Sequence, residues 1–442
     1  MIVTRFAPSP TGRMHLGNLR VAVLNALAAL REEGEFWLRV DDTDAARSEE
    51  RFVEAIRQDL AWLGLTPTGE VRQSQRLDLY ERRFEELRAA GRVYPCFESA
   101  EELDLRRKVL RARGLPPVYE RTALALSEAE VDAKLAAGER PHWRFKLDHT
   151  APIVWHDAVR GEQRFDPAHL SDPVVRRADG SWLYLLPSVI DDIDMGITHV
   201  IRGEDHVSNT AAQAQMFDAL GASRPTFGHV ALLTGAEGKL SKRDGAADRD
   251  ALGEAGIEPE TVRAYLARLG TRDPLEPQTE LMGLAAGFDL SRFGRAPAPV
   301  VAEELATLNA RIVHQLPHER VAERLPPDMT PVAWEALRGN LTRIDEAPTL
   351  WASVVGPVAA PALSDEDRAV VAAAAAVLDG EAFADWKLLT AAVGAATGAK
   401  GRALFLPLRR ALTGADAGPD MASLLPLIGR ERAIERLRAA LA

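Results

Sequence analysis

The chain has 442 residues, of which 46% are hydrophobic and 27% charged, and its formal net charge is -11. This composition excludes a disordered, collagen-like or disulfide-stapled protein, and the single cysteine, Cys96, excludes an internal disulfide and a zinc site built from several cysteines. The acidic balance, taken alone, argues against a nucleic-acid partner. At about 150 residues per domain the length predicts about three domains. No stretch approaches the roughly 18 apolar residues of a membrane span, and the N-terminus lacks a signal-peptide pattern, so we expect a cytoplasmic protein without a membrane partner.

The first part of the chain alternates between strand and helix patterns. Residues 2–6 and 35–40 predict strands, and residues 18–31 and 52–63 place their apolar side chains at helical spacing. The order strand, helix, strand, helix indicates a parallel α/β core. In such a core, ligands bind at the carboxyl ends of the strands.

The central part changes in character. From residue 76 to 181, helical segments rich in Arg and Glu alternate with proline-containing loops, which we interpret as an insertion into the α/β core. Residues 184–190 and 197–201 then predict two further strands, and residues 207–220 predict the next crossover helix. After about residue 310 the chain is rich in Ala and Leu with few β-branched runs, which predicts a separate helical module.

A first chemical motif lies in residues 8–20, PSPTGRMHLGNLR, between the first strand and the first helix. A helix N-terminus offers free N–H groups and a positive dipole end, which suit a phosphate. His15 can donate a hydrogen bond to a phosphate oxygen, and Gly17 allows close approach of a ligand. For the pattern His-x-Gly alone, a proline-rich turn with a capping histidine is an equally good interpretation.

A second motif lies in residues 238–245, GKLSKRDG. Lys239 and Lys242 stand three residues apart in a glycine-flanked loop and can close on a polyphosphate as mobile point charges. The spacing is not that of a P-loop. In isolation, a solvated basic loop is the better interpretation, and only the two motifs together point to a chemical function.

Together the two motifs resemble the HIGH and KMSKS signatures of class I aminoacyl-tRNA synthetases. Further segments resemble bacterial glutamyl-tRNA synthetases, in order and over nearly the whole chain. These segments are RFAPSPTGRMHLGNLR, LRVDDTDAARS, DLAWLGL, RQSQRLDLY, VIDDIDMGITHVIRGEDHVSNTAAQ, KLSKR, LFLPLRRALTG and LLPLIGRERAIERL. So many ordered matches are not expected by accident.

The resemblance implies an α/β protein. It would have a Rossmann-like parallel-sheet catalytic core, an α+β insertion, a helical stem-contact region and an all-α anticodon-binding domain. We place the two halves of the core at 1–77 and 182–237, with the insertion for the acceptor end of the tRNA at 78–181. The KLSKR loop and stem-contact region occupy 238–310, and the helical domain occupies 311–442.

The resemblance also implies the chemistry. Glutamate would attack the α-phosphate of ATP to give glutamyl-adenylate, and the terminal adenosine of tRNA would then accept the glutamyl group. The catalytic residues would be His15, Lys239 and Lys242. The ATP-binding residues would be Pro8, His15, Gly17, Asn18, Glu204, Asp205, Lys239, Ser241, Lys242 and Arg243. The glutamate-binding residues would be Arg5, Ala7, Ser9, Asp41, Tyr184, Ser188, Arg202 and His206. Mg²⁺ is expected only with ATP, no residue is assigned as a metal ligand, and no protein-bound zinc is expected.

Within this set, Arg5 would meet the side-chain carboxylate of glutamate and Asp41 its ammonium group, with Arg202 as a second carboxylate ligand. A surface salt bridge is the alternative for either arginine, and a helix N-cap is the alternative for Asp205. Many relatives carry Glu at the position of Asp41. Ser188 and Leu185 stand where other members have Asn and His, so the finer hydrogen bonding of the pocket is open.

The expected partners are L-glutamate and tRNA-Glu, and the protein is expected to be a monomer. A basic run in the insertion would contact RNA or form a solvated charged face, and it comprises Arg106, Arg107, Lys108, Arg111 and Arg113. RNA contact needs local basic patches rather than a basic protein, so the net charge does not exclude it. Arg338 and Arg343 lie in the region expected to read the anticodon. Three alternatives stay open: an enzyme that charges tRNA-Gln with glutamate for an amidotransferase, a non-catalytic tRNA-binding paralogue, and a small-molecule nucleotidyltransferase.

Overall fold

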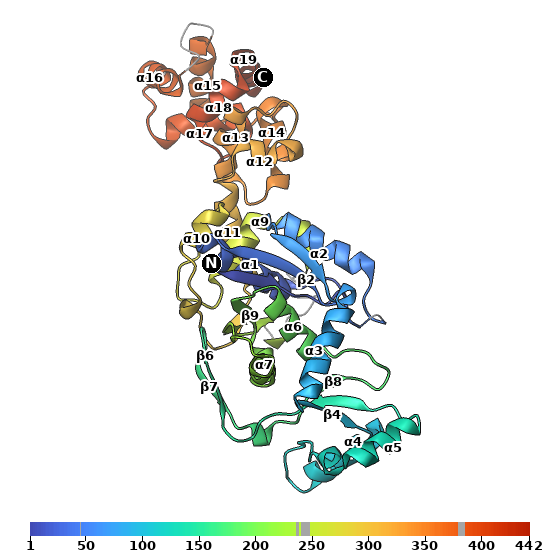
Figure 1. The fold of residues 1–442 in the computed structure, drawn as a ribbon. Coiled ribbons are helices and arrows are strands. Elements are labelled where there is room, and N and C mark those ends of the chain that lie inside the picture. The colour runs from blue at the N-terminus through green and yellow to red at the C-terminus, as the bar shows by residue number, and fades with distance from the viewer. Residues whose placement is uncertain (45, 236–237, 240–247, 379–384) are drawn as a thin grey trace. The chain divides into compact units, whose positions relative to one another are not determined.

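The computed structural model describes all residues except 45, 236–237, 240–247 and 379–384 (Figure 1). The chain divides into two compact units. The first comprises Met1–Ala255 and Val262–Ala302, and the second Gly256–Thr261 and Glu303–Ala442. Among the described helices, none is long and apolar enough to cross a membrane.

The first unit begins with the predicted alternation of strands and helices. β1 (Val3–Phe6), β2 (Glu35–Val40) and β3 (Gly69–Arg72) form a parallel sheet in that order, connected by α1 (Leu16–Arg31) and α2 (Glu50–Trp62). The helix α1 forms because Leu19, Val23 and Leu27 recur on one face and are fully buried. The parallel α/β core expected from the sequence is therefore confirmed.

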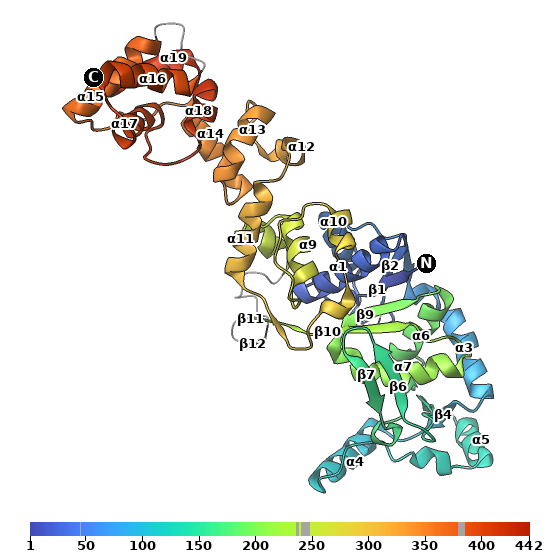
Figure 2. The same cartoon turned by 90° about the vertical axis from the view of Figure 1, so that its left-hand side faces the viewer.

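A second set of strands continues beside β1. β9 (His199–Gly203) lies next to it, where Thr198 N donates to Val3 O at 3.0 Å. β10 (Thr226–Val230) is parallel to β9 and follows it through α7 (Val207–Ala219). The hairpin β6 (Ile153–Asp157) and β7 (Gly161–Phe165) joins this sheet, with Phe227 opposite Asp157 (Figure 2). Part of the segment expected to form the insertion thus contributes to the core sheet.

The prediction of a strand over residues 184–190 is wrong, because the chain forms α6 (Leu185–Asp194) there. A short apolar run rich in β-branched residues does not distinguish a strand from a buried helix. Here Leu186, Val189 and Ile190 are all buried in the core that α6 shares with α7 and α3 (Leu77–Ala89). The acidic run Asp191-Asp192-Ile193-Asp194 is consequently the last turn of a helix and not a loop.

The insertion is a small α+β region. β4 (Val93–Cys96), β5 (His142–Phe145) and β8 (Val174–Arg176) form an antiparallel sheet in that order. α4 (Ala100–Ala112) and α5 (Glu128–Ala136) begin with serine capping boxes at Ser99 and Ser127. Neither helix has a fully buried residue, so both present mostly solvent-exposed side chains.

The remaining elements follow in chain order. Three short strands form one sheet: β11 (Leu233–Gly235), β12 (Gly238–Lys239) and β13 (Ala298–Pro299). The helices before residue 302 are α8 (Arg249–Glu254), α9 (Pro259–Arg268) and α10 (Leu281–Ala286).

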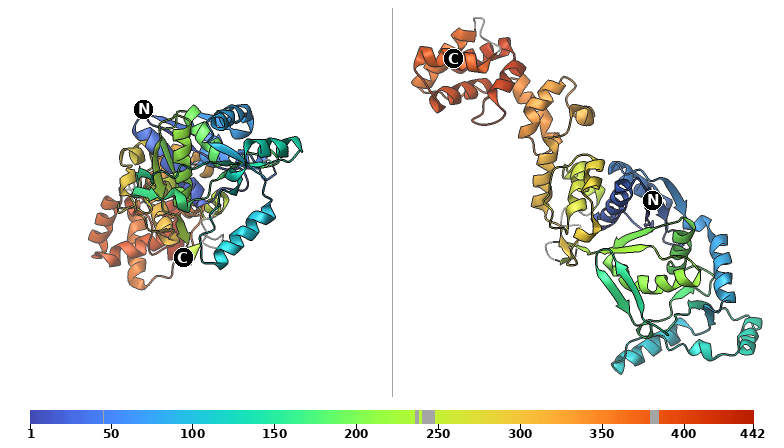
Figure 3. Two further views of the ribbon diagram at one scale, coloured as in Figure 1. Left: turned by 60° about the horizontal axis from the view of Figure 1, so that its bottom comes forward. Right: turned by 60° about the vertical axis from the view of Figure 1, so that its left-hand side comes forward.

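The described part of residues 303–442 contains helices and no strands (Figure 3). These helices are α11 (Ala302–Val313), α12 (His318–Val321), α13 (Pro331–Leu337), α14 (Ala347–Val355), α15 (Asp365–Leu378), α16 (Trp386–Thr397), α17 (Arg402–Thr413), α18 (Met421–Ile428) and α19 (Arg430–Leu441). Trp334, Val371, Leu408 and Leu437 are fully buried. This confirms the all-helical module predicted from the Ala- and Leu-rich composition.

Candidate active site

A cavity of about 880 Å³ opens at the carboxyl ends of β1, β2 and β9 and at the N-terminus of α1. Most of the residues predicted from the sequence to bind ATP or glutamate line it: Arg5, Ala7, Pro8, His15, Gly17, Asn18, Asp41, Tyr184, Ser188, Arg202, Asp205 and His206. Two do not. Ser9 is exposed in the preceding turn, and Glu204 is held in an ion pair with Arg160 at 2.5 Å.

The N-terminus of α1 is shaped by His15. Its Nδ1 accepts a hydrogen bond from Gly17 N at 3.1 Å, and Asn18 Oδ1 accepts from His15 N at 3.2 Å. The capping interpretation of this histidine is therefore correct. Because Nδ1 accepts this bond, Nε2 carries the proton of the neutral ring. Burial lowers the pKa of His15 below its usual value, which favours the neutral form. A neutral N–H donor thus stands where a helix N-terminus attracts a phosphate.

Two arginines on neighbouring strands share one buried carboxylate. Asp192, on α6, accepts at Oδ1 from Arg5 Nε at 3.0 Å and from Arg39 Nη1 at 2.6 Å. Arg5 is 4% exposed, so its interpretation as a surface salt bridge is wrong. Among the described residues only its Nε has a hydrogen-bond partner, and both Nη atoms are available to a carboxylate ligand.

Arg39 also holds Asp41. Arg39 Nε donates to Asp41 Oδ1 at 2.7 Å and Nη2 to Oδ2 at 3.2 Å. Burial raises the pKa of Asp41 to about 6 in spite of this pairing. Arg39 and Asp192 were not among the residues predicted from the sequence. Their position within apolar strand and helix patterns could have indicated them, because charged side chains there need buried partners.

Tyr184, which precedes α6, and His206, which precedes α7, also line the cavity. Tyr184 Oη lies 2.9 Å from His206 Nδ1 and accepts from Asn209 Nδ2 at 2.7 Å. Burial lowers the pKa of His206 to about 4, so the ring is neutral at pH 7. The N-cap residue of α7 is His206, and the N-cap interpretation of Asp205 is therefore wrong.

Arg202 lies at the end of β9 and is 8% exposed, which also excludes a surface salt bridge. Its Nη2 donates to Thr210 Oγ1 at 2.6 Å and to Gln213 Oε1 at 2.7 Å, and its Nε donates to His229 Nε2 at 3.2 Å. Burial lowers the pKa of Arg202 to about 10, which still leaves it charged at pH 7.

The second motif is only partly described. The backbone of Lys239 lies in β12, where it pairs with Thr234 of β11. Ser241, Lys242 and Arg243 lie outside the described residues.

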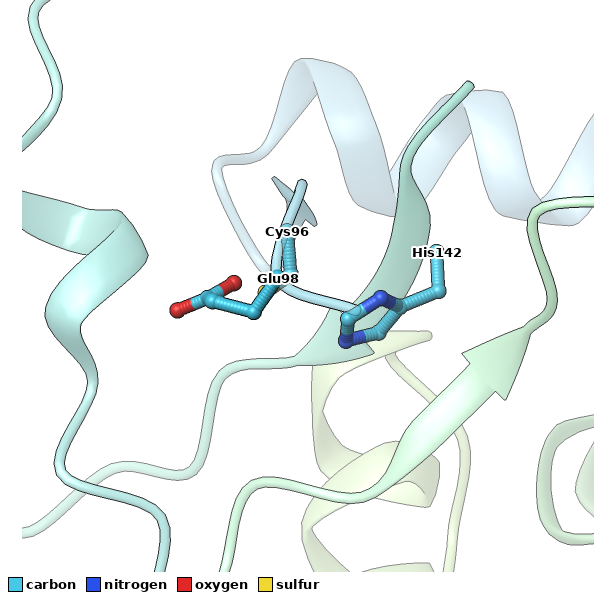
Figure 4. A group of neighbouring side chains, drawn as sticks. All are labelled: Cys96, Glu98 and His142. Carbon is cyan, nitrogen blue, oxygen red and sulfur yellow. The ribbon is translucent and has the colours of Figure 1, made fainter. Parts of the chain in front are cut away.

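One group of possible metal ligands occurs among the described residues, at the edge of the insertion sheet (Figure 4). Ligand atoms of Cys96, Glu98 and His142 lie within 4.8 Å of one another, and Glu98 Oε2 and His142 Nε2 are buried without a hydrogen-bond partner among the described residues. Burial raises the pKa of Cys96 to about 12, and Glu98 Oε1 accepts from Tyr119 and Thr122. A structural zinc site needs a thiolate and four ligands, which this group does not supply.

Residues 1–305 match the family model of tRNA synthetases class I (E and Q), catalytic domain, and residues 361–441 match an anticodon binding domain. The chain is 62% identical to glutamate–tRNA ligase 1 of Rhizorhabdus wittichii over 100% of both chains, and 61% identical to glutamate–tRNA ligase 1 of Novosphingobium aromaticivorans over 99% of both. A glutamate tRNA ligase from Elizabethkingia meningosepticum, solved with its amino acid, superposes with a TM-score of 0.82 at 27% identity, covering 100% of this chain and 99% of that one. The chain therefore belongs to the class I tRNA synthetases of the glutamate and glutamine (E and Q) group, as its sequence motifs predicted.

Proposed function

We propose that this protein is a glutamate–tRNA ligase that charges tRNA-Glu in the cytoplasm as a monomer. The observation that carries the proposal is that the buried side chains of Arg5 and Arg202 and the carboxylate of Asp41 line the same cavity. The other buried arginines that line it, Arg20 and Arg39, already donate to acceptors of the protein. Glutamate has two carboxylates and one ammonium group at neutral pH. The charges of Arg5, Arg202 and Asp41 are therefore complementary to the charges of the amino acid. The names of the curated relatives support the same activity.

In the first step, an α-carboxylate oxygen of glutamate attacks the α-phosphate of ATP, and pyrophosphate leaves. In the second, the terminal ribose hydroxyl of tRNA attacks the carbonyl carbon of glutamyl-adenylate, and AMP leaves. Neither step requires a covalent bond to the enzyme, so the rate depends on positioning and on stabilisation of the charge that develops on phosphate.

The residues of the cavity have distinct roles in these steps. Arg5 pairs with the side-chain carboxylate of glutamate and Asp41 holds its ammonium group, with Arg202 as the second carboxylate ligand. His15 donates from Nε2 to a phosphate oxygen beside the N-terminus of α1. Lys239 and Lys242 contact the polyphosphate. Mg²⁺ bound through the phosphates of ATP would neutralise part of their charge.

The tRNA would contact both units. In the insertion, α4 and its C-cap carry five exposed basic side chains, which are Arg106, Arg107, Lys108, Arg111 and Arg113. Arg107 and Lys108 are paired with Asp104, and such exposed ion pairs contribute little and exchange readily for phosphates. We assign this run to the acceptor end of the tRNA and the helical unit to the anticodon. The end of the helical unit is basic, because residues 400–442 hold 8 basic and 4 acidic side chains, and this excess of positive charge suits an RNA partner.

One experiment tests the proposal. Purified protein is incubated with ATP, Mg²⁺, radiolabelled glutamate and separate transcripts of tRNA-Glu and tRNA-Gln. Label on tRNA-Glu supports the proposal, and label on neither RNA contradicts it. Label on tRNA-Gln identifies an enzyme that supplies an amidotransferase.

A further inference from the structure

A buried aspartate–histidine pair lies directly behind Arg202. Asp157 ends β6 and His229 lies on β10, and both side chains are completely buried. Asp157 Oδ2 and His229 Nδ1 are 2.5 Å apart, and His229 Nε2 accepts from Arg202 Nε at 3.2 Å. Neither Asp157 nor His229 lines the cavity. The pair reaches the cavity through Arg202, and His229 Nε2 also lies 2.9 Å from Thr210 Oγ1, which itself accepts from Arg202.

The geometry defines where the proton of His229 resides. The other oxygen of Asp157, Oδ1, accepts from the backbone N–H groups of Val159 at 3.0 Å, Arg160 at 2.9 Å and His229 at 3.1 Å. Burial alone would raise the pKa of Asp157. These backbone bonds, together with the bond between Oδ2 and the His229 ring, outweigh burial, so the pKa lies below its usual value and the group is a carboxylate. A carboxylate only accepts, so Nδ1 of His229 carries the proton. Burial lowers the pKa of His229, and its Nε2 is thus an acceptor.

An acceptor at Nε2 is what Arg202 needs. A guanidinium has only donors, and a protonated Nε2 would set two donors against each other. With His229 on Nε and with Thr210 and Gln213 on Nη2, two sides of the guanidinium are held. Among the described residues, Nη1 has no hydrogen-bond partner, and Arg202 lines the cavity.

We propose that Asp157 and His229 are positioning residues for glutamate recognition. Asp157 selects the tautomer of His229, and His229 orients the guanidinium of Arg202 so that Nη1 remains available to a substrate carboxylate. This inference rests on the proposed function. It also links substrate recognition to the β6–β7 hairpin, which belongs to the segment between the two halves of the core.

The test is Asp157→Asn in the full-length enzyme. The three backbone N–H groups at Oδ1 require an oxygen there, so the amide nitrogen of the asparagine must take the place of Oδ2. It then donates to Nδ1, the proton of His229 moves to Nε2, and Arg202 Nε faces a donor. We expect the KM for glutamate to rise about tenfold or more, because a hydrogen bond to a charged group is lost. The KM for ATP and kcat should stay within about threefold.

His229→Gln provides the rescue. Its side-chain oxygen can stand where Nε2 stands and accept from Arg202 without the help of Asp157. We expect a KM for glutamate near that of the wild type, and no further increase when Asp157→Asn is added to His229→Gln. A merely structural role of Asp157 predicts the same increase in both backgrounds. Should Asp157→Asn not fold, His229→Asn replaces it: its shorter amide cannot reach the Nε2 position, so its KM should exceed that of His229→Gln about tenfold.

Asp172→Asn is the matched control. Asp172 is also fully buried in the same segment and accepts from Tyr94 and Leu147, but it does not contact Arg202. Its KM for glutamate should be that of the wild type. An active wild-type enzyme with an unchanged KM in Asp157→Asn, or with equal increases in both backgrounds, would overturn this inference alone. A wild-type enzyme that attaches no glutamate to either tRNA would overturn the proposed function and the inference with it.

Discussion

Replacing Gly17 by alanine should separate the catalytic role of the α1 N-terminus from its structural role. A Cβ at Gly17 would lie 2.9 Å from Cε1 and 3.0 Å from Nδ1 of His15. Real Cβ atoms do not approach this closely, so the imidazole must turn away and its bond from Gly17 N, 3.1 Å long, must break. The substitution therefore moves the imidazole that we propose as the phosphate donor, without deleting it.

The effect on stability should be small because two contributions oppose each other. Loss of the N-cap bond costs about 1 kcal/mol. Alanine in place of glycine within a helix contributes up to about 1 kcal/mol in the other direction. We expect the melting temperature to change by about 4 °C or less. The effect on activity should be large, because a misplaced donor to a phosphate that gains charge in the transition state costs about 100-fold.

The assay is aminoacylation of tRNA-Glu at subsaturating ATP, with tRNA present throughout. Gly17→Ala should lower kcat/KM for ATP about 100-fold. Gly12→Ala, in the same segment, is the control, since a Cβ there meets no atom within 4 Å. Wild-type kinetics in Gly17→Ala would refute the phosphate role of His15. A decrease of the melting temperature well beyond 4 °C would instead show that the contact between His15 and Gly17 is mainly structural.

Three further predictions concern the same enzyme. Because burial raises the pKa of Asp41 to about 6, protonation below that pH removes the ammonium ligand, and kcat/KM for glutamate should fall about tenfold per pH unit below pH 6. His206, whose pKa burial lowers to about 4, does not titrate in this window, so Asp41→Asn should abolish this limb of the profile, and its persistence would refute the assignment. Lys242→Ala should lower kcat about 100-fold with an unchanged melting curve, and an unaffected rate would refute the polyphosphate contact. Purified protein should contain no stoichiometric zinc by elemental analysis, and dialysis against EDTA followed by return of Mg²⁺ should restore full activity; zinc bound at Cys96, with activity lost on its removal, would contradict this expectation.

Local patterns in the sequence determined a large part of this protein. The strands β1 and β2 and the helices α1, α2 and α7 were predicted closely, because apolar periodicity and breaking prolines act within a few residues. The motif around His15 predicted a helix N-terminus for the same reason. Family resemblance added Arg5, Asp41, Tyr184 and Arg202, all of which line one cavity.

Only the tertiary structure decided how these residues are held. Arg5 and Asp192 are 187 positions apart, and Asp157 and His229 are 72 apart, so no local period connects them. Residues 184–190 were mistaken for a strand because burial on several sides, and not periodicity, makes them apolar. A buried charge needs a partner, but which partner it finds depends on which strands and helices the fold places side by side. The sequence by itself thus pointed to the groups that line the cavity, and the tertiary structure decided which groups hold them in place.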